Sequence, residues 1–145
     1  MTLEDNKAIV LSWFDAFNDR NLGAADRIFA PEYTLHEPGL PPGFPKGPEG
    51  LKAFAGGLLL AFPDWHATIE DVVAEGDRVV LRFTEEGTHQ GQLEHIPPSG
   101  KKVRIGGVSI FRMSGGKIAE EWEFADSLGL LQQIGAIAAG EEGEG

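Results

Sequence analysis

The chain has 145 residues, of which 41% are hydrophobic and 24% charged, values that fit one ordinary globular domain. It has no cysteine, which excludes disulfides, zinc–thiolate sites and thiol nucleophiles. The net charge of −11 at pH 7 disfavours a nucleic-acid partner, because an acidic surface repels the phosphate backbone.

The residues that follow Met1 lack the basic start and the apolar run of a signal peptide. No stretch approaches the 18 or more apolar residues that a membrane span needs. We therefore expect a cytoplasmic protein with no membrane partner. We expect one domain over residues 1–139 and a disordered acidic tail over residues 140–145, which contain no apolar side chain.

The first part of the chain has a helical pattern. Ile9, Trp13 and Phe17 recur at four-residue spacing and predict an amphipathic helix. Residues 22–29 place apolar side chains on one face of a short second helix, which Pro31 is expected to end.

A proline-rich segment separates this part from a third helix. Residues 33–37 predict a brief extended segment. Residues 38–47 contain four prolines and three glycines, which favours an ordered loop that is a candidate rim or lid of a pocket. Pro48 suits the first turn of a helix, and Pro63 is expected to stop it.

The second half predicts strands at residues 65–74, 78–89, 102–113 and 117–125. Short glycine-bearing turns join the first two strands and the last two, so these pairs are expected to be antiparallel. A final helix follows, capped by Asp126 or Ser127. Helices followed by a meander predict an α+β fold, and we expect a cone in which a curved antiparallel sheet wraps around the N-terminal helices and encloses one pocket.

The second half of the chain contains a series of short motifs in a distinctive order. They are Glu75–Val80, Gly87–His89, Ile96–Lys101, Gly107–Arg112, Gly115–Ile118, Glu120–Glu123, Asp126 and Leu130–Gly135. In this order they resemble the SnoaL-like polyketide cyclases, also called ester cyclases, of the nuclear-transport-factor-two-like superfamily. The match covers nearly the whole chain except the acidic tail.

The resemblance implies a conical α+β barrel with a deep apolar pocket and no cofactor. Cyclases of this family close a ring by aldol condensation on a polyketide ester and use a single aspartate as acid and base. By its position after the final-strand tryptophan, that aspartate corresponds to Asp126. The family commonly pairs its sheets, so the resemblance also implies a homodimer. From the family's activity, it implies a small apolar or polycyclic carbonyl substrate.

The residues of the last strand support a buried carboxyl group independently. Strand alternation places Trp122, Phe124 and Asp126 on one face, and Glu121 and Glu123 on the other. A face with Trp and Phe is expected to point to the interior, where burial raises the pKa of Asp126 and makes it a better base near neutral pH. The alternative is that Asp126 caps the last helix.

Three further side chains are candidates to assist Asp126. His36 and His89 are the histidines expected nearest the pocket, and either one is suited to donate a hydrogen bond to an enolate oxygen. Arg82, if it points inward, pairs with Asp126 or binds a substrate oxygen. The alternatives are two structural or rim histidines and an exterior arginine paired with a glutamate.

The expected pocket wall consists of bulky side chains and hydroxyl groups, most of which also fit a simple core. These residues are Trp13, Phe17, Tyr33, Phe54, Leu58, Phe62, Thr84, Ser109, Phe111, Trp122 and Phe124. The four histidines show no metal-ligand spacing, so we expect no metal site and no cofactor.

These features favour base-catalysed carbon–carbon bond formation or isomerisation on a small carbonyl compound. Two alternatives stay open at this point. One is epoxide hydrolysis, which the superfamily carries out with an Asp-Arg-Asp trio of which Arg82 and Asp126 would supply two members. The other is a pocket that binds a small ligand without catalysis.

Overall fold

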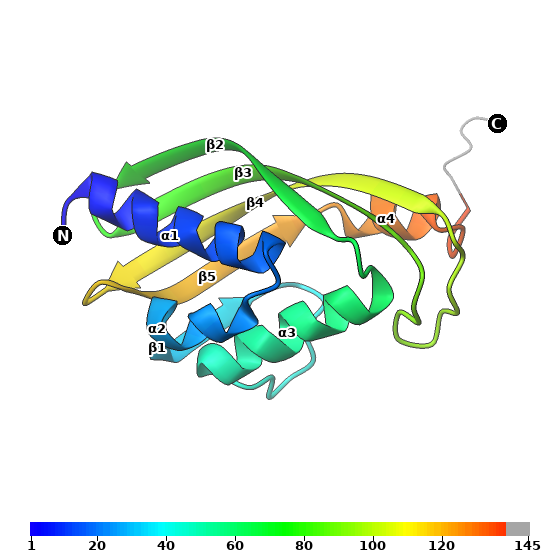
Figure 1. Ribbon diagram of the computed structural model, residues 1–145, viewed down its shortest axis with the longest axis horizontal. Helices are drawn as coiled ribbons and strands as arrows, with labels where there is room; N and C mark the ends of the chain where they lie inside the picture. Colours follow the sequence, from blue (N-terminus) through cyan, green and yellow to red (C-terminus); the bar gives the residue numbers. More distant parts are fainter. Residues whose placement is uncertain (139–145) are drawn as a thin grey trace.

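The computed structural model describes residues 1–138 and has an α+β fold (Figure 1). The prediction for residues 140–145 lies outside the described residues. The elements are, in order, α1 (Leu3–Asn18), a 3-10 turn (Leu22–Ala24), α2 (Ala25–Ile28), β1 (Phe29–His36), α3 (Gly47–Ala61), β2 (His66–Glu75), β3 (Arg78–Thr88), β4 (Lys102–Ser114), β5 (Lys117–Ala125) and α4 (Ser127–Gln133).

The five strands form one open sheet in the order β1-β5-β4-β3-β2. Strands β2 to β5 pair antiparallel, as the short turns predict for β2–β3 and β4–β5, and β3 and β4 pair in the same way across a longer connection. In the β4–β5 turn, Gly115 and Gly116 both have positive φ, which glycine adopts without steric cost. The expectation of a fully antiparallel sheet is wrong at β1, which runs parallel to β5. No hairpin joins these two strands, so no turn imposes the antiparallel direction.

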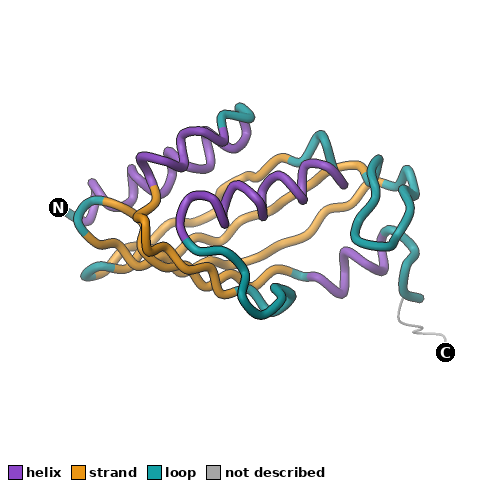
Figure 2. The backbone as a smooth tube through the Cα atoms, turned by 90° about the horizontal axis from the view of Figure 1, so that it is seen from below, coloured by secondary structure: helices purple, strands orange, loops and turns teal. Residues whose placement is uncertain are grey.

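Helices α1 and α3 lie against the same face of the sheet, and neither covers the other face (Figure 2). The apolar stripe predicted for the first helix is confirmed, because Val10, Trp13 and Phe17 of α1 are buried in the core. Thr2 and Asp5 form a capping box that fixes the start of this helix. We call the helix-covered side of the sheet the inner face and the opposite side the outer face.

Two boundaries differ from the sequence prediction. The second helix ends at Ile28, before Pro31, and the chain then enters β1, which is longer than the extended segment expected. Pro31 is tolerated there because β1 is an edge strand, where a residue without an N–H group costs least. None of the helices among residues 1–138 is long and apolar enough to cross a membrane.

A bulge in β5 decides which of its residues point inward. Ile118 pairs with Met113, but Glu120 pairs with Arg112, so Ala119 is an extra residue between two regular stretches. After the bulge Glu121 faces inward and is buried, whereas Phe124 is 60% exposed. The prediction that Trp122, Phe124 and Asp126 face the interior is therefore wrong.

Candidate active site

A cavity of about 50 Å³ lies between the inner face of the sheet and the two long helices. Its helical wall is apolar and comes from α1 and α3. The residues of this wall are Trp13, Phe14, Phe17, Leu51, Phe54, Ala55 and Leu58. Three carboxyl groups complete the lining from the sheet, those of Glu85, Glu121 and Glu123. We call these three residues the carboxyl cluster.

Strand register places the cluster. Glu121 and Glu123 are two residues apart on β5 and thus share its inner face, opposite Phe111 and Ser109 of β4. Glu85 comes from β3, on the other side of β4, where it pairs with Ile105. The cluster therefore approaches the cavity from two strands that β4 separates.

Glu121 is the most firmly held member of the cluster. Its side chain is buried and accepts hydrogen bonds from the Tyr33 hydroxyl, at 2.7 Å on Oε1, and the Ser109 hydroxyl, at 3.0 Å on Oε2. Burial raises the pKa of Glu121 to about 7, and these two hydrogen bonds oppose the rise. The pKa of Tyr33 is also raised well above its usual value, first by burial and then by the charge of Glu121.

Glu123 lies two residues after Glu121 on β5 and lines the same cavity. Burial raises the pKa of Glu123 well above its usual value, and the negative charges of Glu121, Glu85 and Glu37 raise it further. These surroundings favour the protonated form of Glu123.

Glu85 has a different environment. Burial raises its pKa to about 7, and the Trp65 indole near it favours the ionised form and opposes the rise. The indole N–H of Trp65 is itself buried and makes no close hydrogen bond within the described residues. A carboxyl group with a pKa near 7 gains and loses its proton readily at neutral pH, which is the property of a general acid or base.

The predicted wall residues that do not lie on the outer face divide into three groups. Trp13, Phe17, Phe54 and Leu58 line the cavity, as expected. Tyr33 and Ser109 do not line it but hold Glu121 in place. The other two inner residues of the predicted wall, Phe62 and Phe111, are fully buried in the core.

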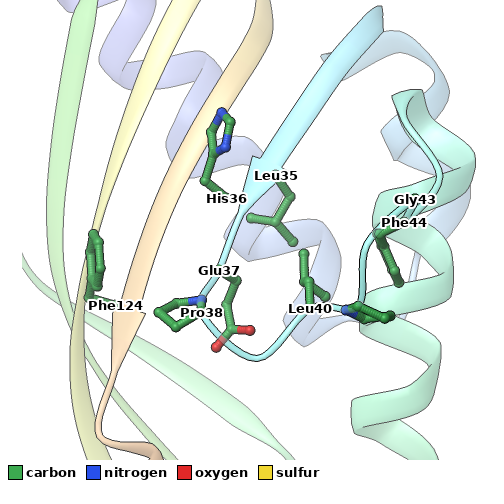
Figure 3. A pocket seen from close by; sticks show the side chains of 9 residues that line it. Leu35, His36, Glu37, Pro38, Leu40, Gly43, Phe44 and Phe124 are labelled. Carbon is green, nitrogen blue, oxygen red and sulfur yellow. The ribbon is translucent and has the colours of Figure 1, made fainter.

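The remaining predicted wall residues lie on the outer face. Thr84 donates a hydrogen bond to Glu70, and the Trp122 ring stacks on His36 with centroids 5.2 Å apart. Phe124 lies beside the proline-rich loop (Figure 3). The structure does not bring these side chains to the cavity, because alternation turns them away from the helices.

The predicted partners of Asp126 are also dispersed. His36 Nε2 lies 2.7 Å from Glu120 Oε2 on the outer face. Arg82 is exposed and pairs with Asp71 at 2.7 Å, which agrees with the alternative of an exterior arginine, although its partner is an aspartate and not the glutamate expected.

His89 is fully buried, and its Nδ1 atom accepts a hydrogen bond from the Ser99 N–H. Its ring packs on Phe62, with ring centroids 5.3 Å apart. It is not among the residues that line the cavity. This environment agrees with the alternative of a structural histidine.

Asp126 is exposed and caps α4. One of its carboxylate oxygens accepts a hydrogen bond from the Gly129 N–H at 2.9 Å. A side chain at position 129 would collide with the capping carboxylate, so the glycine suits the cap. The structure therefore agrees with the capping alternative and places Asp126 outside the cavity.

Sequence reasoning missed Glu85, Glu121 and Glu123 as functional residues. Glu85 continues the alternating inner row of Leu81 and Phe83, which was a usable signal. The two β5 glutamates gave a weaker signal, because an ordinary strand points Trp and Phe inward and glutamates outward. Among residues 1–138, no three His, Asp or Glu side chains converge in a way that could hold a metal ion.

A second and larger hollow, about 460 Å³, lies at the end of β1 (Figure 3). The proline-rich loop forms most of its lining, as the prediction of a pocket rim suggested. The lining residues are Leu35, His36, Glu37, Pro38, Leu40, Pro41, Gly43, Phe44 and Phe124. Glu37 links this hollow to the cluster, because its charge raises the pKa of Glu123.

Comparisons with known proteins agree with this architecture. The model of the SnoaL-like polyketide cyclase family matches residues 7–134. The nogalonic acid methyl ester cyclase of Streptomyces nogalater is 28% identical over 88% of this chain and 96% of its own length. The aklanonic acid methyl ester cyclase DauD of Streptomyces sp. (strain C5) is 30% identical over 79% of this chain and 74% of its own.

A solved structure, that of TsrD from Streptomyces laurentii, superposes with a TM-score of 0.84 at 29% identity. The superposition covers 94% of this chain and 99% of TsrD. The likeness thus spans nearly the whole of both chains. With a family model that matches most of its length, the chain belongs to the SnoaL-like polyketide cyclase family.

Proposed function

We propose that the protein is a cofactor-independent cyclase that closes a ring in a carbonyl compound by acid/base catalysis. The observation that carries this proposal is the carboxyl cluster beneath an aromatic wall in one enclosed cavity. Burial raises the pKa of all three carboxyl groups, so the cavity contains groups that exchange protons near neutral pH.

The reaction is an intramolecular aldol addition. A carboxylate takes a proton from a carbon activated by neighbouring carbonyl groups, and the resulting enolate carbon bonds to a second carbonyl carbon of the same molecule. The oxygen of that carbonyl takes up a proton. One hydrogen has then moved from carbon to oxygen, so the product has the same mass as the substrate. The cavity contributes by holding the reacting ends together.

The names of the two relatives indicate the substrate class. They are cyclases of nogalonic acid methyl ester and of aklanonic acid methyl ester. We propose a polyketide methyl ester of this kind as the substrate here. Trp13, Phe14 and Phe17 on one side of the cavity and Phe54 on the other supply aromatic surfaces suited to flat rings.

Such a substrate requires the cavity to widen. Its volume of about 50 Å³ is well below the roughly 300–1,000 Å³ typical of small-molecule sites. Phe54 and Leu58 of α3 are partly exposed and form the outer part of the wall, so their movement is the shortest route to a larger site. We propose that substrate enters past these two side chains.

The two alternatives from the sequence gain no support from the geometry. Arg82 and Asp126 do not meet, because Arg82 pairs with Asp71 on the outer face and Asp126 caps α4. An Asp-Arg-Asp trio of the kind used for epoxide hydrolysis therefore does not form from them. Binding without catalysis is an outcome of the experiment below.

The test is conversion of nogalonic acid methyl ester to an isomer of unchanged mass, followed by chromatography with mass detection. We expect the wild-type protein to convert the ester and the double variant Glu85→Gln/Glu123→Gln to lose at least about 100-fold in rate. The matched control is Glu86→Gln/Glu120→Gln, which changes two outer-face glutamates in the same strands.

Conversion that is equally fast in the inner and the outer double variants would contradict a catalytic cluster. Tight binding of the ester without conversion would show a binding module instead.

We also propose a homodimer formed through the outer face. Val73, Val80, Ile110 and Trp122 form one apolar row across four paired strands. In the next row Phe124 is 60% exposed, and the Arg82–Asp71 pair lies in the same row on β3 and β2. A second copy related by a two-fold axis would cover this apolar surface. A cytoplasmic location, expected from the sequence, stays a prediction.

Sedimentation of the wild type and of Phe124→Asp tests the dimer. We expect the wild type to sediment as a dimer and the variant as a monomer, because a charge would be buried at the contact. A monomeric wild type would refute this proposal and leave the cyclase untouched.

A further inference from the structure

The carboxyl cluster contains two separate proton sites rather than three equivalent acids. Glu121 and Glu123 lie next to one another on β5, whereas Glu85 comes from β3, with β4 between. All three line the same cavity. An aldol ring closure needs proton transfer at two different atoms, a carbon that loses a proton and an oxygen that gains one. One site on each side of the cavity fits that requirement.

The hydrogen bonds around Glu121 decide which member of the β5 pair holds the proton. The hydroxyl of Tyr33 donates to one carboxylate oxygen of Glu121, and that of Ser109 donates to the other. Two donors stabilise a negative charge on Glu121. Glu123 lines the same cavity two residues further along β5, so the negative charge of Glu121 favours the protonated form of Glu123. Glu123 is therefore the acid of the pair, and Glu121 is the charged neighbour that keeps it protonated.

Glu85 has a hydrogen-bond donor beside it. Its neighbour is the indole of Trp65, whose N–H group donates and never accepts, and which opposes the rise that burial causes in the pKa of Glu85. That N–H is buried and makes no hydrogen bond among the described residues, so it is free to donate to an ionised Glu85. Glu85 shares no proton with another carboxyl group, and its oxygens are free to accept one from a ligand in the cavity.

We infer that Glu85 is the base that takes the proton from carbon and that Glu123 is the acid that gives a proton to the new hydroxyl group. This inference rests on the ring-closing function proposed above and assigns its two proton transfers. Glu121 is a positioning residue, because its negative charge keeps Glu123 protonated.

The steps balance as follows. Ionised Glu85 takes the proton of the activated C–H bond, and the electron pair of that bond becomes the enolate. The enolate carbon forms a bond to the second carbonyl carbon, and the π pair of that C=O group moves to its oxygen. The Glu123 hydroxyl proton passes to this oxygen. Glu85 is now protonated and Glu123 ionised, and return of one proton from Glu85 to Glu123 through water restores the starting state.

The two transfers can be measured separately in D₂O with nogalonic acid methyl ester as the probe. Exchange of the activated C–H for deuterium in recovered ester reports the base alone, and formation of the isomer reports both groups. We expect Glu85→Gln to lose exchange and ring closure together, each by at least about 100-fold. We expect Glu123→Gln to keep exchange at the wild-type level while ring closure falls by about 100-fold.

The control is Glu86→Gln, which removes the adjacent carboxylate of β3 on the outer face, where it pairs with Arg104. We expect this variant to match the wild type in both measurements. Thermal melting checks that each variant folds. If a glutamine variant does not fold, Glu85→Asp and Glu123→Asp replace it. These keep the acid but shorten its reach, and the same split between exchange and closure is expected.

Loss of exchange in Glu123→Gln, or its retention in Glu85→Gln, would overturn the assignment while the cyclase function stands. A wild-type protein that neither exchanges nor closes the ring would overturn the function itself and, with it, this inference.

Discussion

The two faces of the sheet shift the pKa values of glutamate side chains in opposite directions. On the inner face, glutamates lie beneath aromatic rings, and burial raises their pKa. On the outer face, Glu120 accepts hydrogen bonds from His36 and Arg112. These bonds, the one from His36 most of all, lower the pKa of Glu120. Glu120 and Glu121 are neighbours in the chain, so the difference comes from the side of the sheet and not from local sequence.

This comparison shows where the protein can store reactive protons. A carboxylate that is exposed or paired with a cation stays ionised at neutral pH, whereas one that has lost water and gained no cation keeps its proton longer. The inner face meets the second condition at three positions, and we therefore place the chemistry there.

The largest difference between the two faces is expected in ring closure, when Glu121 and Glu120 are each replaced by glutamine in separate variants. Glu121→Gln removes the negative charge that keeps Glu123 protonated and should lower ring closure about 10- to 100-fold. It should also move the high-pH limb of the rate profile to lower pH, since Glu123 loses its proton more easily without a negative neighbour. Glu120→Gln should leave both quantities within about two-fold. Equal effects of the two variants on the rate profile would remove the distinction between the faces.

The pH dependence of folding is the next contrast. Glu85 has a pKa of about 7 when folded and about 4.3 when unfolded, so between these values the unfolded chain has released a proton that the native state keeps. Raising the pH through this range therefore lowers the free energy of unfolding, by about 1–3 kcal/mol for this group. Glu120, with its lowered pKa, acts in the opposite direction and loses its contribution as the pH falls.

Urea denaturation of the wild type and of Glu85→Gln at pH 5 and pH 8 measures this difference. Between pH 5 and pH 8, the free energy of unfolding should fall more in the wild type than in the variant. Parallel pH dependence in the two proteins would show that Glu85 is not buried as described.

A smaller effect is expected at the hydroxyl groups that hold Glu121. Ser109→Ala removes a donor from a buried carboxylate, which costs about 1–3 kcal/mol of unfolding free energy. Because that donor favours the ionised form, the pKa of Glu121 should rise further. Thr84→Ala on the outer face, which removes a hydrogen bond to Glu70, should cost less than about 1 kcal/mol. Denaturant melts of both variants compare the two faces directly, and a larger loss in Thr84→Ala would contradict the account.

The smallest effect on turnover is expected at Asp126, which follows the last residue of β5. Asp126→Ala should cost about 1 kcal/mol of stability through loss of the helix cap. Ring closure measured at a temperature where the variant is folded should stay within about two-fold of the wild type. A fall of 100-fold in that assay would return the chemistry to this residue.

Most of the fold could be predicted from the sequence because it depends on local signals. The four-residue spacing of Ile9, Trp13 and Phe17 and the glycine turns between strands predict elements whose positions the structure confirms within a few residues. The parallel pairing of β1 with β5 was not accessible in this way. It joins residues 86 to 89 positions apart in the chain, and no turn between them signals the pairing.

The site was harder to predict from the sequence, because it depends on which residues of β5 point to the inner face. The extra residue Ala119 reverses the alternation between Ile118, which is buried on the inner face, and Trp122, which is on the outer face. A single sequence does not reveal such a bulge, and Trp122 and Phe124 then suggest the wrong face. Tyr33 offered a partial signal, since a buried hydroxyl group requires a partner and Glu121 provides it.

The central claim, that burial raises the pKa of the inner-face glutamates well above the usual range, is tested most directly by NMR titration of ¹³C-labelled glutamate carboxyl groups. The account predicts that the signals of Glu85 and of the Glu121–Glu123 pair titrate near or above pH 7, and that Glu85→Gln removes one of them. Titration of every glutamate between about pH 4 and 5, the usual range of an exposed carboxyl group, would contradict it.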